Sequence, residues 1–579
     1  MSIEIESFKF PFSNIIPHLK SGNRLYELPD DSIFLIPLEW FSKYKPLADF
    51  GKTQNNTIQI QKNQFTLLEE TGITTENNSF AKEIIPYQTT GTINATLRRY
   101  QEEGVNWLVK NYQLGLGSCL ADDMGLGKTV QSLAYLDFVF TRFENDFISI
   151  EETPNALDLF STNEPVSTKR LKALVVAPSS LTYNWFNETK KFAPHFTRLN
   201  YTGLDRKIKH KKLEKVDLVF TSYSSLLRDI NLLKTFHFNF LIIDESQQIK
   251  NRNSKIYKAI NTINAKHKVS LSGTPIENSL SDLWSQMQFI NPNLLNTYSF
   301  FDSHFKKPIE KVNDIQKIKE LKSLINPYLL RRTKQEVAKD LPELSEQIFY
   351  SEMTNEQAKL YDNEKSIVRN YLIEKQFNNG IEKPESKISI LNALSKLRQL
   401  ANHPNLIEEN LASGKFIDAS AYIETLLQAK QKTLIFSSYT SHLKIYTDWC
   451  DQNSISYSLL TGSTNLKDRE TQVNNFQKDD SKLLFFISLK AGGVGLNLTK
   501  ASYVILLDPW WNPFAEMQAI GRAHRIGQEN QVNVIRFIAK DTIEEKINQL
   551  QNTKKDISNT IIENTIPEEV FNNISYILE

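Results

Sequence analysis

The sequence predicts an α/β protein with two parallel-sheet lobes, helical insertions between them and a small N-terminal α+β accessory region. Two series of short apolar runs support this, because each run is too short for a helix and ends in polar residues. The runs alternate with helical stretches, which favours parallel sheets with helices on both faces and ligand-binding loops at the C-terminal ends of the strands. Residues 296–410 break this strand rhythm and separate the two series.

Five segments are expected along the 579 residues, a length that allows several domains with sizeable cores. They are an accessory region at 1–88, a first lobe at 89–295, a helical insertion and inter-lobe linker at 296–410, a second lobe at 411–540, and a C-terminal brace helix and tail at 541–579.

Individual elements follow from the same patterns. The expected strands lie at 117–120, 173–177, 217–220, 240–243 and 269–271 in the first lobe, and at 433–436, 457–460, 483–487, 503–507 and 532–537 in the second. In the accessory region we expect a hairpin from 24–28 and 32–37 and a helix at 38–48. The polar, acidic stretch 141–170 is expected to be a long loop.

Composition is ordinary for a soluble protein, with 23% charged and 40% hydrophobic residues. The net charge of +1 means that a nucleic-acid surface would have to be a local basic stripe. Two cysteines, Cys119 and Cys450, exclude a disulfide framework and a zinc site of four thiolates. The acidic N-terminus is unlike a secretory signal, and no apolar run approaches a membrane span, so we expect a cytoplasmic protein.

A glycine-bearing loop at 121–129 ends in Lys128 and Thr129 and follows the first expected strand. Its two glycines would let backbone N–H groups close around phosphate oxygens, and a helix starting near Lys128 would direct its positive end toward them. Lys128 would reach the β- and γ-phosphates, and Thr129 would ligate magnesium. The general motif has a glycine where this chain has Asp122, so an ordinary strand–turn–helix remains the alternative. The expected nucleotide contacts here are Asp123, Met124, Gly125, Leu126, Gly127, Lys128 and Thr129.

Two carboxylates, Asp244 and Glu245, stand at the C-terminal end of the apolar run 240–243. Asp244 is placed to hold magnesium, and Glu245 to orient and deprotonate an attacking water. The alternative is a strand that ends in an acidic turn.

Two arginines, Arg522 and Arg525, lie three residues apart within 518–528, so on a helix both would leave the same face. Fixed guanidinium groups suit the charge that develops on a transferred phosphoryl group. As a lone segment, the stretch would instead be read as a solvated basic helix.

These three motifs, in this order, resemble the Swi/Snf-related branch of the superfamily-two helicase-like ATPases over residues 90–550. The resemblance implies two RecA-like lobes with ATP held between them, magnesium as cofactor and double-stranded DNA as the polymer that is tracked. Gln247 stands where eukaryotic remodellers usually have histidine, which favours a bacterial member. The stretches 328–334 and 397–404 resemble motifs of the family's helical insertions.

The resemblance also implies further site residues. Gln101 would read the adenine edge through its amide, Gly495 and Gln518 would lie at the nucleotide cleft, and Ser272 with Thr274 would couple the ATP site to the nucleic-acid side.

Small hydroxyl-bearing residues and glycine-rich turns suit contacts to a sugar–phosphate backbone, because they need not read base edges. The alternatives are helix capping for the hydroxyls and hydrophobic packing for the tryptophan. The expected DNA contacts are Ser180, Thr221, Ser222, Ser437, Thr461, Gly462, Lys490, Gly492, Gly493 and Trp510.

The function expected from these motifs is a DNA-stimulated ATPase that translocates on double-stranded DNA and remodels or displaces DNA-bound proteins. The alternatives are a strand-separating DNA or RNA helicase and a non-catalytic DNA-binding scaffold. A small-molecule P-loop kinase would give no role to the distant arginine pair. We expect a monomeric, nucleoid-associated protein with an unidentified DNA-bound protein as its second partner and no membrane contact. Nothing in the accessory region could build the zinc module of some relatives, so the chain lacks that module or is part of a longer protein.

Overall fold

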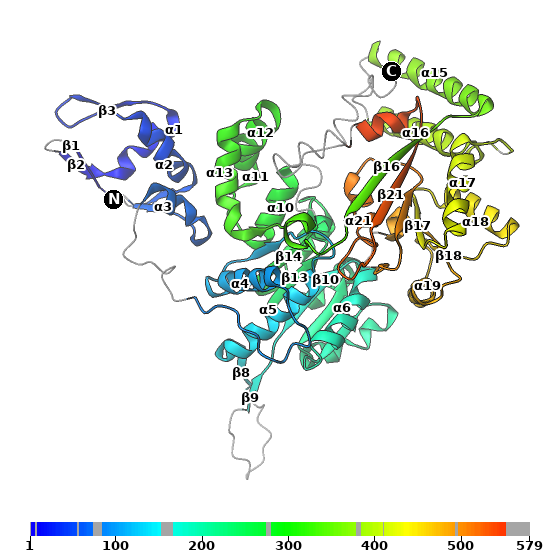
Figure 1. Cartoon of the computed structure of the whole chain (residues 1–579). Coiled ribbons are helices and arrows are strands. Elements are labelled where there is room, and N and C mark those ends of the chain that lie inside the picture. The colour runs from blue at the N-terminus through cyan, green and yellow to red at the C-terminus, as the bar shows by residue number, and fades with distance from the viewer. Residues whose placement is uncertain are drawn as a thin grey trace, which may run out of the picture.

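The computed structural model describes residues 2–5, 8–54, 57–72, 84–151, 166–273, 280–377, 384–408, 410–492, 496–549 and 551. Two parallel sheets form the centres of two lobes, and a smaller N-terminal region lies beside the first lobe (Figure 1). Within these residues, none of the helices combines the length and apolar character that crossing a membrane requires.

The first lobe is built on a seven-stranded parallel sheet with the order β11-β12-β10-β13-β14-β7-β15. All five strands expected here are confirmed, whereas β11 and β15 were missed. The strands are β7 (Ser118–Leu120), β10 (Ala173–Ala177), β11 (Arg198–Tyr201), β12 (Leu218–Ser222), β13 (His237–Asp244), β14 (Asn264–Leu271) and β15 (Leu329–Leu330).

Both faces of this sheet are buried, as β10 illustrates. Leu174 and Val176 enter one apolar core, whereas Ala173, Val175 and Ala177 enter the core on the opposite face. Helices cover both faces, which confirms the expected layering. The helices of the first lobe that matter most for the site are α4 (Arg99–Gln113), α5 (Lys128–Arg142), α6 (Ser179–Phe192), α7 (Tyr223–Arg228), α9 (Lys255–Asn261) and α10 (Leu280–Ile290).

The second lobe is built on a six-stranded parallel sheet with the order β16-β21-β20-β17-β19-β18. The five strands expected between 433 and 537 are confirmed with small shifts at their ends. The elements are β16 (Leu344–Ser351), β17 (Thr433–Ser437), β18 (Tyr457–Leu460), β19 (Leu484–Ser488), β20 (Tyr503–Leu506), β21 (Val532–Ala539), α17 (Gly414–Gln428), α18 (Thr440–Gln452), α19 (Leu466–Lys478), α20 (Leu489–Gly492) and α21 (Pro513–Ile520).

The stretch between 296 and 410 is mainly helical but gives one strand to each sheet. β15 pairs with β7 in the first lobe, and β16 pairs along its whole length with β21 in the second. The helices here include α11 (Tyr298–Phe301), α12 (Lys307–Val312), α13 (Ile315–Ile325), α14 (Lys334–Val337), α15 (Asn355–Phe377) and α16 (Pro384–Asn402). The segment after β15 therefore runs from one lobe to the other.

The long loop expected at 141–170 was only partly right, because its ends pair as antiparallel strands β8 (Ile148–Glu151) and β9 (Val166–Lys169). In the accessory region, the expected hairpin is confirmed as β3 (Leu25–Glu27) with β4 (Ile33–Leu35), followed by the expected helix α2 (Leu38–Phe50).

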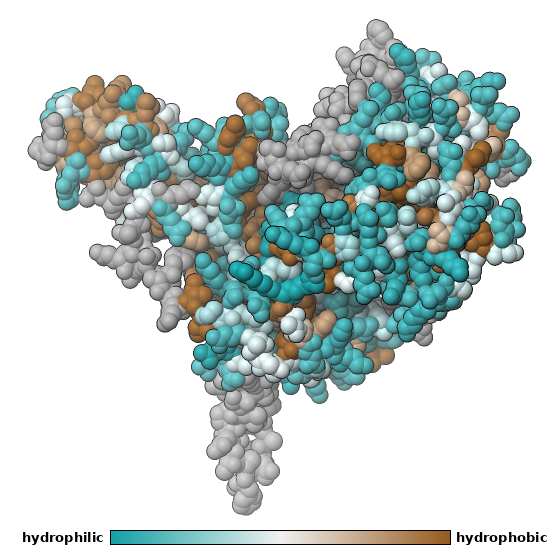
Figure 2. Space-filling view, viewed as in Figure 1, coloured by the Kyte–Doolittle hydropathy of each residue, from teal (hydrophilic) through white to brown (hydrophobic). Residues whose placement is uncertain are grey.

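The accessory region docks on the first lobe through buried polar contacts. The Gln64 amide donates to the backbone carbonyls of Asn293 (3.2 Å) and Leu294 (3.1 Å), and the Tyr328 hydroxyl donates to the carbonyl of Asn63 (2.6 Å). Hydrophobic residues also gather over this region on the face shown in Figure 2. Its exposed apolar side chains are Leu25, Ile33, Leu35 and Leu38.

Candidate nucleotide site between the two lobes

The phosphate loop connects β7 to α5, and its conformation depends on two glycines. Gly125 and Gly127 have φ angles of 88° and 81°, in the left-handed region that other residues seldom adopt. Gly127 is the N-cap of α5, so the positive end of that helix starts at Lys128, as the sequence predicts. A Cβ atom on Gly125 would lie 2.9 Å from Cγ of Arg525, so the loop and an arginine of the other lobe approach closely.

Several donors hold the loop in shape. The Lys128 ammonium group donates to the backbone carbonyls of Asp122 (2.5 Å) and Asp123 (3.3 Å). The carbonyl of Leu126 accepts from the Tyr100 hydroxyl (3.0 Å) and the Gln101 amide (3.1 Å). The loop is therefore folded around its own lysine, with α4 packed behind it.

Gln101, the expected adenine reader, is buried and uses both ends of its amide within the protein. Besides donating to Leu126, it accepts a hydrogen bond from the backbone N–H of Arg98 (2.9 Å). In this arrangement Gln101 joins the start of α4 to the phosphate loop.

Asp122 occupies the place of the first glycine of the general motif and is fully buried. The guanidinium group of Arg332 donates to both of its carboxylate oxygens, at 2.9 and 2.6 Å. Arg332 comes from the segment directly after β15, so the linker between the lobes holds the base of the phosphate loop.

Asp244 ends β13 next to the loop, and Glu245 follows it. Asp244 accepts from the indole N–H of Trp185 (2.8 Å) and from the backbone N–H of Glu245 (2.9 Å), which orients its carboxylate. Burial raises the Asp244 pKa, and Lys128 and Arg522 lie close enough to oppose that shift.

Glu245 has a left-handed backbone, with φ of 52°, which is unusual for a residue other than glycine and is found where a site holds strain. Burial, followed by the nearby Asp244 carboxylate, raises the Glu245 pKa to about 7. The Gln247 amide donates to this carboxylate at 2.7 Å, and the Gln247 carbonyl accepts from Ser272 at 3.4 Å. Ser272 is thus joined to Glu245 through a single side chain.

The two arginines come from the second lobe. α21 ends at Ile520, so Arg522 and Arg525 lie in the turns that follow it, and the shared helix face considered for them does not apply. Arg522 is buried and approaches the sulfur of Met124 at 3.9 Å. Burial lowers its pKa to about 10, although Glu245 and Asp244 favour the charged form. With Arg525 against Gly125, both arginines face the phosphate loop.

Lys334 joins the two halves of the site. Its backbone N–H donates to Asp123 of the phosphate loop (3.0 Å), and its ammonium group donates to the carbonyl of His524 in the second lobe (2.5 Å). Burial lowers the Lys334 pKa to about 8, and Arg525, Arg522 and Lys128 act in the same direction.

Pockets lie along the seam between the lobes. One of about 60 Å³ is lined by Asp123, Met124, Gly273, Lys334, Phe514, Met517 and Gln518. A larger one, about 330 Å³, is lined by Gln247, Gln248, Lys250, Asn251, Asn512, Ala515 and Gln518. Gln518 borders both pockets, and Gln247 faces it from the first lobe.

The residues expected to contact DNA differ in exposure. Thr221, Ser222 and Ser437 are buried and bonded internally, to the Tyr201 carbonyl (3.0 Å), the Ser225 N–H (3.1 Å) and the Asp508 carboxylate (2.6 Å) respectively. Ser180, Thr461 and Trp510 are half-buried, Gly462 is exposed, and Lys490 and Gly492 belong to α20. Thr274, Gly493 and Gly495 lie outside the described residues.

A magnesium ion at this seam would find hard oxygen donors. Magnesium in phosphate sites takes one or two protein oxygens, and substrate phosphates and water complete its shell. The oriented Asp244 carboxylate and the half-buried Thr129 at the start of α5 fit that pattern. In the described part of the chain, no cluster of three or more His, Cys, Asp or Glu side chains forms an alternative metal site.

Family profiles match both lobes. The SNF2-related domain matches residues 100–406, and the helicase conserved C-terminal domain matches residues 418–527. The first match alone spans more than half of the chain. The chain belongs to the SNF2-related family of helicase-like ATPases.

Relatives of this SNF2-related chain occur in bacteria, archaea and eukaryotes. YwqA of Bacillus subtilis, named as an ATP-dependent helicase/translocase, is 34% identical over 521 residues, which cover 87% of this chain and 53% of YwqA. The ISWI chromatin-remodeling complex ATPase ISW2 of Saccharomyces cerevisiae is 32% identical, with 78% of this chain and 39% of ISW2 covered. The Sulfolobus solfataricus SWI2/SNF2 ATPase core, solved in complex with double-stranded DNA, is 36% identical, with 82% and 94% covered and a TM-score of 0.40. The chain spans about half or less of the curated relatives named here.

Three residues around this SNF2-related site were not singled out from the sequence: Trp185, Arg332 and Lys334. Arg332 and Lys334 lie within a stretch that resembles an insertion motif, so a signal was present but gave them no partner. The partners of Trp185 and Arg332 are 59 and 210 residues away in the chain, a separation that no local pattern encodes.

Proposed function

We propose that this chain is an ATP-dependent translocase on double-stranded DNA that remodels or displaces DNA-bound proteins, and that DNA stimulates its ATP hydrolysis. The observation that carries the proposal is that Arg522 and Arg525 of the second lobe lie against the phosphate loop and the acidic pair of the first. A site divided in this way is complete only when the lobes are closed.

The roles in hydrolysis follow from the chemistry of each group. Lys128 and the backbone N–H groups at the start of α5 would bind the β- and γ-phosphates. Thr129 and Asp244 would hold magnesium, which supplies charge neutralisation to the phosphates when bound. The raised pKa of Glu245 makes it a stronger base for an attacking water than an exposed glutamate. The two arginines would stabilise the charge on the departing phosphoryl group.

Movement along DNA would use the same closure. The loops expected to grip the sugar–phosphate backbone stand at the C-terminal ends of strands in both sheets, as in β12, β17 and β18. Closing one lobe on the other would shift one set of loops relative to the other, so that hydrolysis and stepping share one conformational change. Backbone contacts of this kind imply slight sequence preference and steep salt dependence.

Two experiments test the proposal. ATP hydrolysis is measured without nucleic acid and with duplex DNA, single-stranded DNA or duplex RNA, and we expect the largest stimulation with duplex DNA. Displacement of a third strand from a DNA triplex is measured beside unwinding of a plain duplex. Triplex displacement without unwinding supports translocation, whereas unwinding without triplex displacement supports a strand-separating helicase. If the chain hydrolyses no ATP under any of these conditions, the result supports the alternative of a non-catalytic DNA-binding scaffold.

The wider biological role is part of the same proposal. We propose a monomer that acts near the nucleoid in the cytoplasm on an unidentified protein bound to duplex DNA. Relatives named as a translocase and as the ATPase of a chromatin-remodeling complex support this role. Sedimentation of the pure chain with and without duplex DNA tests the monomeric state, because a second copy would double the mass.

A further inference from the structure

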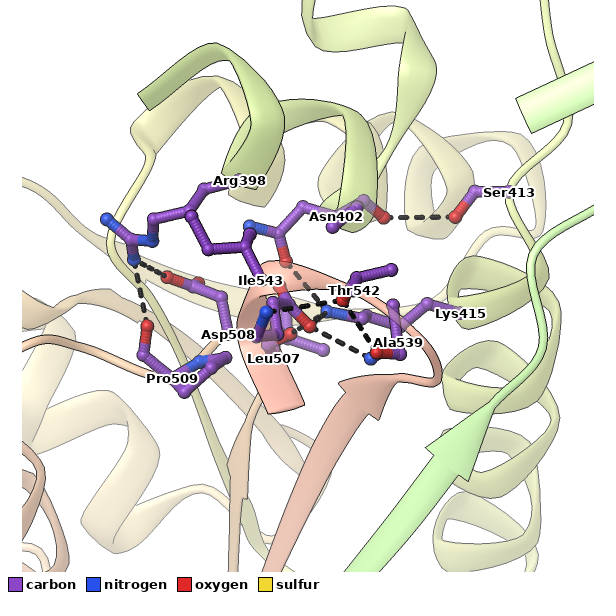
Figure 3. A network of polar contacts seen from close by, with 12 residues as sticks. Arg398, Asn402, Ser413, Lys415, Leu507, Asp508, Pro509, Ala539, Thr542 and Ile543 are labelled. Atoms are coloured by element: carbon purple, nitrogen blue, oxygen red, sulfur yellow. Dashed lines mark hydrogen bonds and ion pairs between the residues drawn. The ribbon is translucent and has the colours of Figure 1, made fainter. Parts of the chain in front are cut away.

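The motif at 397–404 has no part in the ATP site, although it resembles the end of the family's helical insertion. Its residues 397–402 form the end of α16, and its arginine, Arg398, is buried with 3% of its surface exposed. A buried guanidinium group is costly unless its partners are well placed. Figure 3 shows that Arg398 points into a polar network between α16 and the second lobe.

Arg398 contacts the loop that follows β20. One nitrogen of its guanidinium group donates to the carbonyl of Pro509 (2.8 Å) and approaches the Asp508 carboxylate (3.4 Å). The planar group also lies 4.9 Å from the ring centre of Trp510 and 5.8 Å from that of Trp511. Charge, a hydrogen bond and contacts with two aromatic rings therefore all act on residues 508–511.

Asp508 carries the contact on to a second loop. Its carboxylate accepts from the hydroxyl of Ser437, the last residue of β17 (2.6 Å), and from the backbone N–H of Ser438, which follows it (2.9 Å). Arg398 also lies 5.4 Å from the ring centre of Tyr439 in the same loop. One buried arginine thus supports both loops, 437–439 and 508–511, and these contain two of the expected DNA contacts.

The helix that carries Arg398 is itself anchored. Asn402, one turn further along α16, accepts from the Lys415 ammonium group (3.0 Å), which also pairs with Glu544. Both partners of that ion pair are fully buried, and Glu544 accepts from the backbone N–H of Ala539 (2.9 Å). α16, α17 and the helical residues after β21 are therefore locked together beneath the two loops (Figure 3).

We propose that Arg398 is a positioning residue that sets the nucleic-acid grip of the second lobe by holding loops 437–439 and 508–511 in register. The inference rests on the proposed function, because it presumes that these loops meet DNA. Arg398 is too deeply buried to reach a phosphate itself, so its influence on DNA passes through the loops. The helical insertion would therefore affect DNA binding by positioning the two loops of the second lobe.

The test compares Arg398→Met, Arg398→Lys and Lys396→Met in the full chain. Lys396 lies on the same helix, is 46% exposed at its side chain and pairs with Glu364, so its replacement controls for changes in α16 alone. For each protein, ATP hydrolysis is followed against duplex concentration, ATP concentration and salt. A charged hydrogen bond is worth about tenfold or more in an equilibrium constant. We therefore expect Arg398→Met to raise the duplex concentration for half-maximal stimulation about tenfold, with KM for ATP within twofold.

Two further readouts separate positioning from general stability. The slope of log affinity against log salt should become shallower in Arg398→Met, because misplaced loops make fewer phosphate contacts. Arg398→Lys keeps the charge but loses the planar group that lies beside Trp510 and Trp511, and should recover part of the lost affinity. Equal changes in KM for ATP and in duplex affinity would overturn the proposal, as would a loss of the same size in Lys396→Met.

A double-mutant cycle combines an Arg398 variant with Asp508→Asn. If Arg398→Met folds poorly, Arg398→Lys takes its place in the cycle, so the proposal can still be tested. If Arg398 acts through Asp508, the double variant should bind duplex about as weakly as the weaker single variant. Additive losses would overturn the proposal. A wild-type chain without duplex stimulation would refute the proposed function instead, whereas equal stimulation in wild type and Arg398→Met would refute only the positioning role.

Discussion

Arg332 and Asp122 form a buried ion pair beneath the phosphate loop, with guanidinium nitrogens 2.9 and 2.6 Å from the two carboxylate oxygens. The same guanidinium group donates to the Gln131 amide oxygen at 3.0 Å, so the arginine bridges the start of the loop and the helix that follows it. This explains how the loop keeps its shape where the general motif has a glycine. Asp122 lacks the backbone freedom of a glycine, but Arg332 of the inter-lobe segment holds its carboxylate in place.

Replacing Arg332 with methionine should destabilise the first lobe, because Asp122 is fully buried and would lose its counter-charge. Breaking a buried pair in this way costs about 3–5 kcal/mol. Urea unfolding monitored by tryptophan fluorescence measures the change. Arg98→Met is the control, because the Arg98–Asp340 pair is largely exposed and should be worth less than about 1 kcal/mol. Equal losses in both variants would argue against the anchoring role.

Replacing Glu245 with glutamine should remove the base while leaving the phosphate loop intact. General-base catalysis contributes about 10²–10⁴-fold, and we expect a fall in duplex-stimulated hydrolysis within that range. Binding of a fluorescent ATP analogue should stay within about threefold of wild type, since the variant removes transition-state stabilisation. The exposed Glu103→Gln should hydrolyse ATP normally. Hydrolysis by Glu245→Gln at the wild-type rate would show that another group activates the water.

Replacing Lys128 with alanine should act differently, because Lys128 is assigned to the phosphates themselves. We expect both nucleotide binding and hydrolysis to fall, with turnover lost by orders of magnitude. Equilibrium binding of the same analogue, measured beside phosphate release, distinguishes this pattern from that of the glutamate variant. Undiminished binding would place the Lys128 ammonium group away from the phosphates.

Replacing Arg525 with alanine should spare nucleotide binding and reduce hydrolysis by about 10³-fold, the lower range for an arginine that stabilises a phosphoryl transition state. Its stem packs on Gly125 from the opposite lobe, so the arginine can act only across the seam. Single-turnover hydrolysis with pre-bound ATP measures the chemical step directly. Loss of nucleotide binding with unchanged single-turnover hydrolysis would make Arg525 a binding residue.

The central strands could be predicted from the sequence because they are short, buried and apolar on both faces. The residues of β10 and β17 are all buried, β10 reads as a continuous apolar run, and β17 has an apolar run between a threonine and a serine. β16 could not be predicted in the same way, because it is an edge strand whose residues 346–350 are exposed and partly polar. β15 has only two residues, which are too few to show an apolar pattern in the sequence, and it is a strand only because it pairs with β7.

The chemistry-bearing residues of the site could be named from the sequence because their spacing is local, as in Lys128 with Thr129 or Asp244 with Glu245. Their supports could not be named. Trp185 reads as an apolar residue in a helix, and only the fold places its indole N–H on Asp244. Likewise, Ser437 reads as an exposed hydroxyl at the end of a strand, whereas the structure buries it against Asp508. Long-range polar pairing decides these cases.

We expect the pH profile of kcat/KM for ATP to fall on its alkaline side because Lys334 loses its proton. Burial lowers its pKa from 10.5 to about 8, so the native chain releases this proton at a lower pH than the unfolded chain does. The buried charge therefore costs stability below pH 8, and that cost disappears as the pH rises from 8 to 10.5. In the native chain the positive charge itself is lost around pH 8, so kcat/KM for ATP should fall as the pH rises through about 8.

The control for this prediction is Lys334→Arg, which stays charged at every accessible pH. The variant should lose the limb near pH 8 or shift it upward by more than one unit. The neighbouring charges are Asp123, Arg522, Arg525 and Lys128, and they are unchanged in the variant. A limb near pH 8 that persists in Lys334→Arg would assign the titration to another group.

Replacing Trp185 with phenylalanine should weaken hydrolysis although the residue lies in the apolar core of the first lobe. The indole N–H donates to Asp244 at 2.8 Å, and this bond leaves the second carboxylate oxygen to the backbone of Glu245. Phenylalanine keeps an aromatic ring but removes the donor, so the carboxylate would be oriented by the Glu245 N–H alone. A hydrogen bond to a charged group is worth about 1.5–3 kcal/mol, so kcat/KM for ATP should fall about tenfold or more.

The matched control for this prediction is Trp284→Phe. This variant also removes a hydrogen bond of a buried indole, to the Asn296 carbonyl at 3.2 Å, but away from the acidic pair. If the two variants lose activity equally, the effect of Trp185 is packing; if only Trp185→Phe loses activity while both melt alike, the indole orients the carboxylate that the reaction needs.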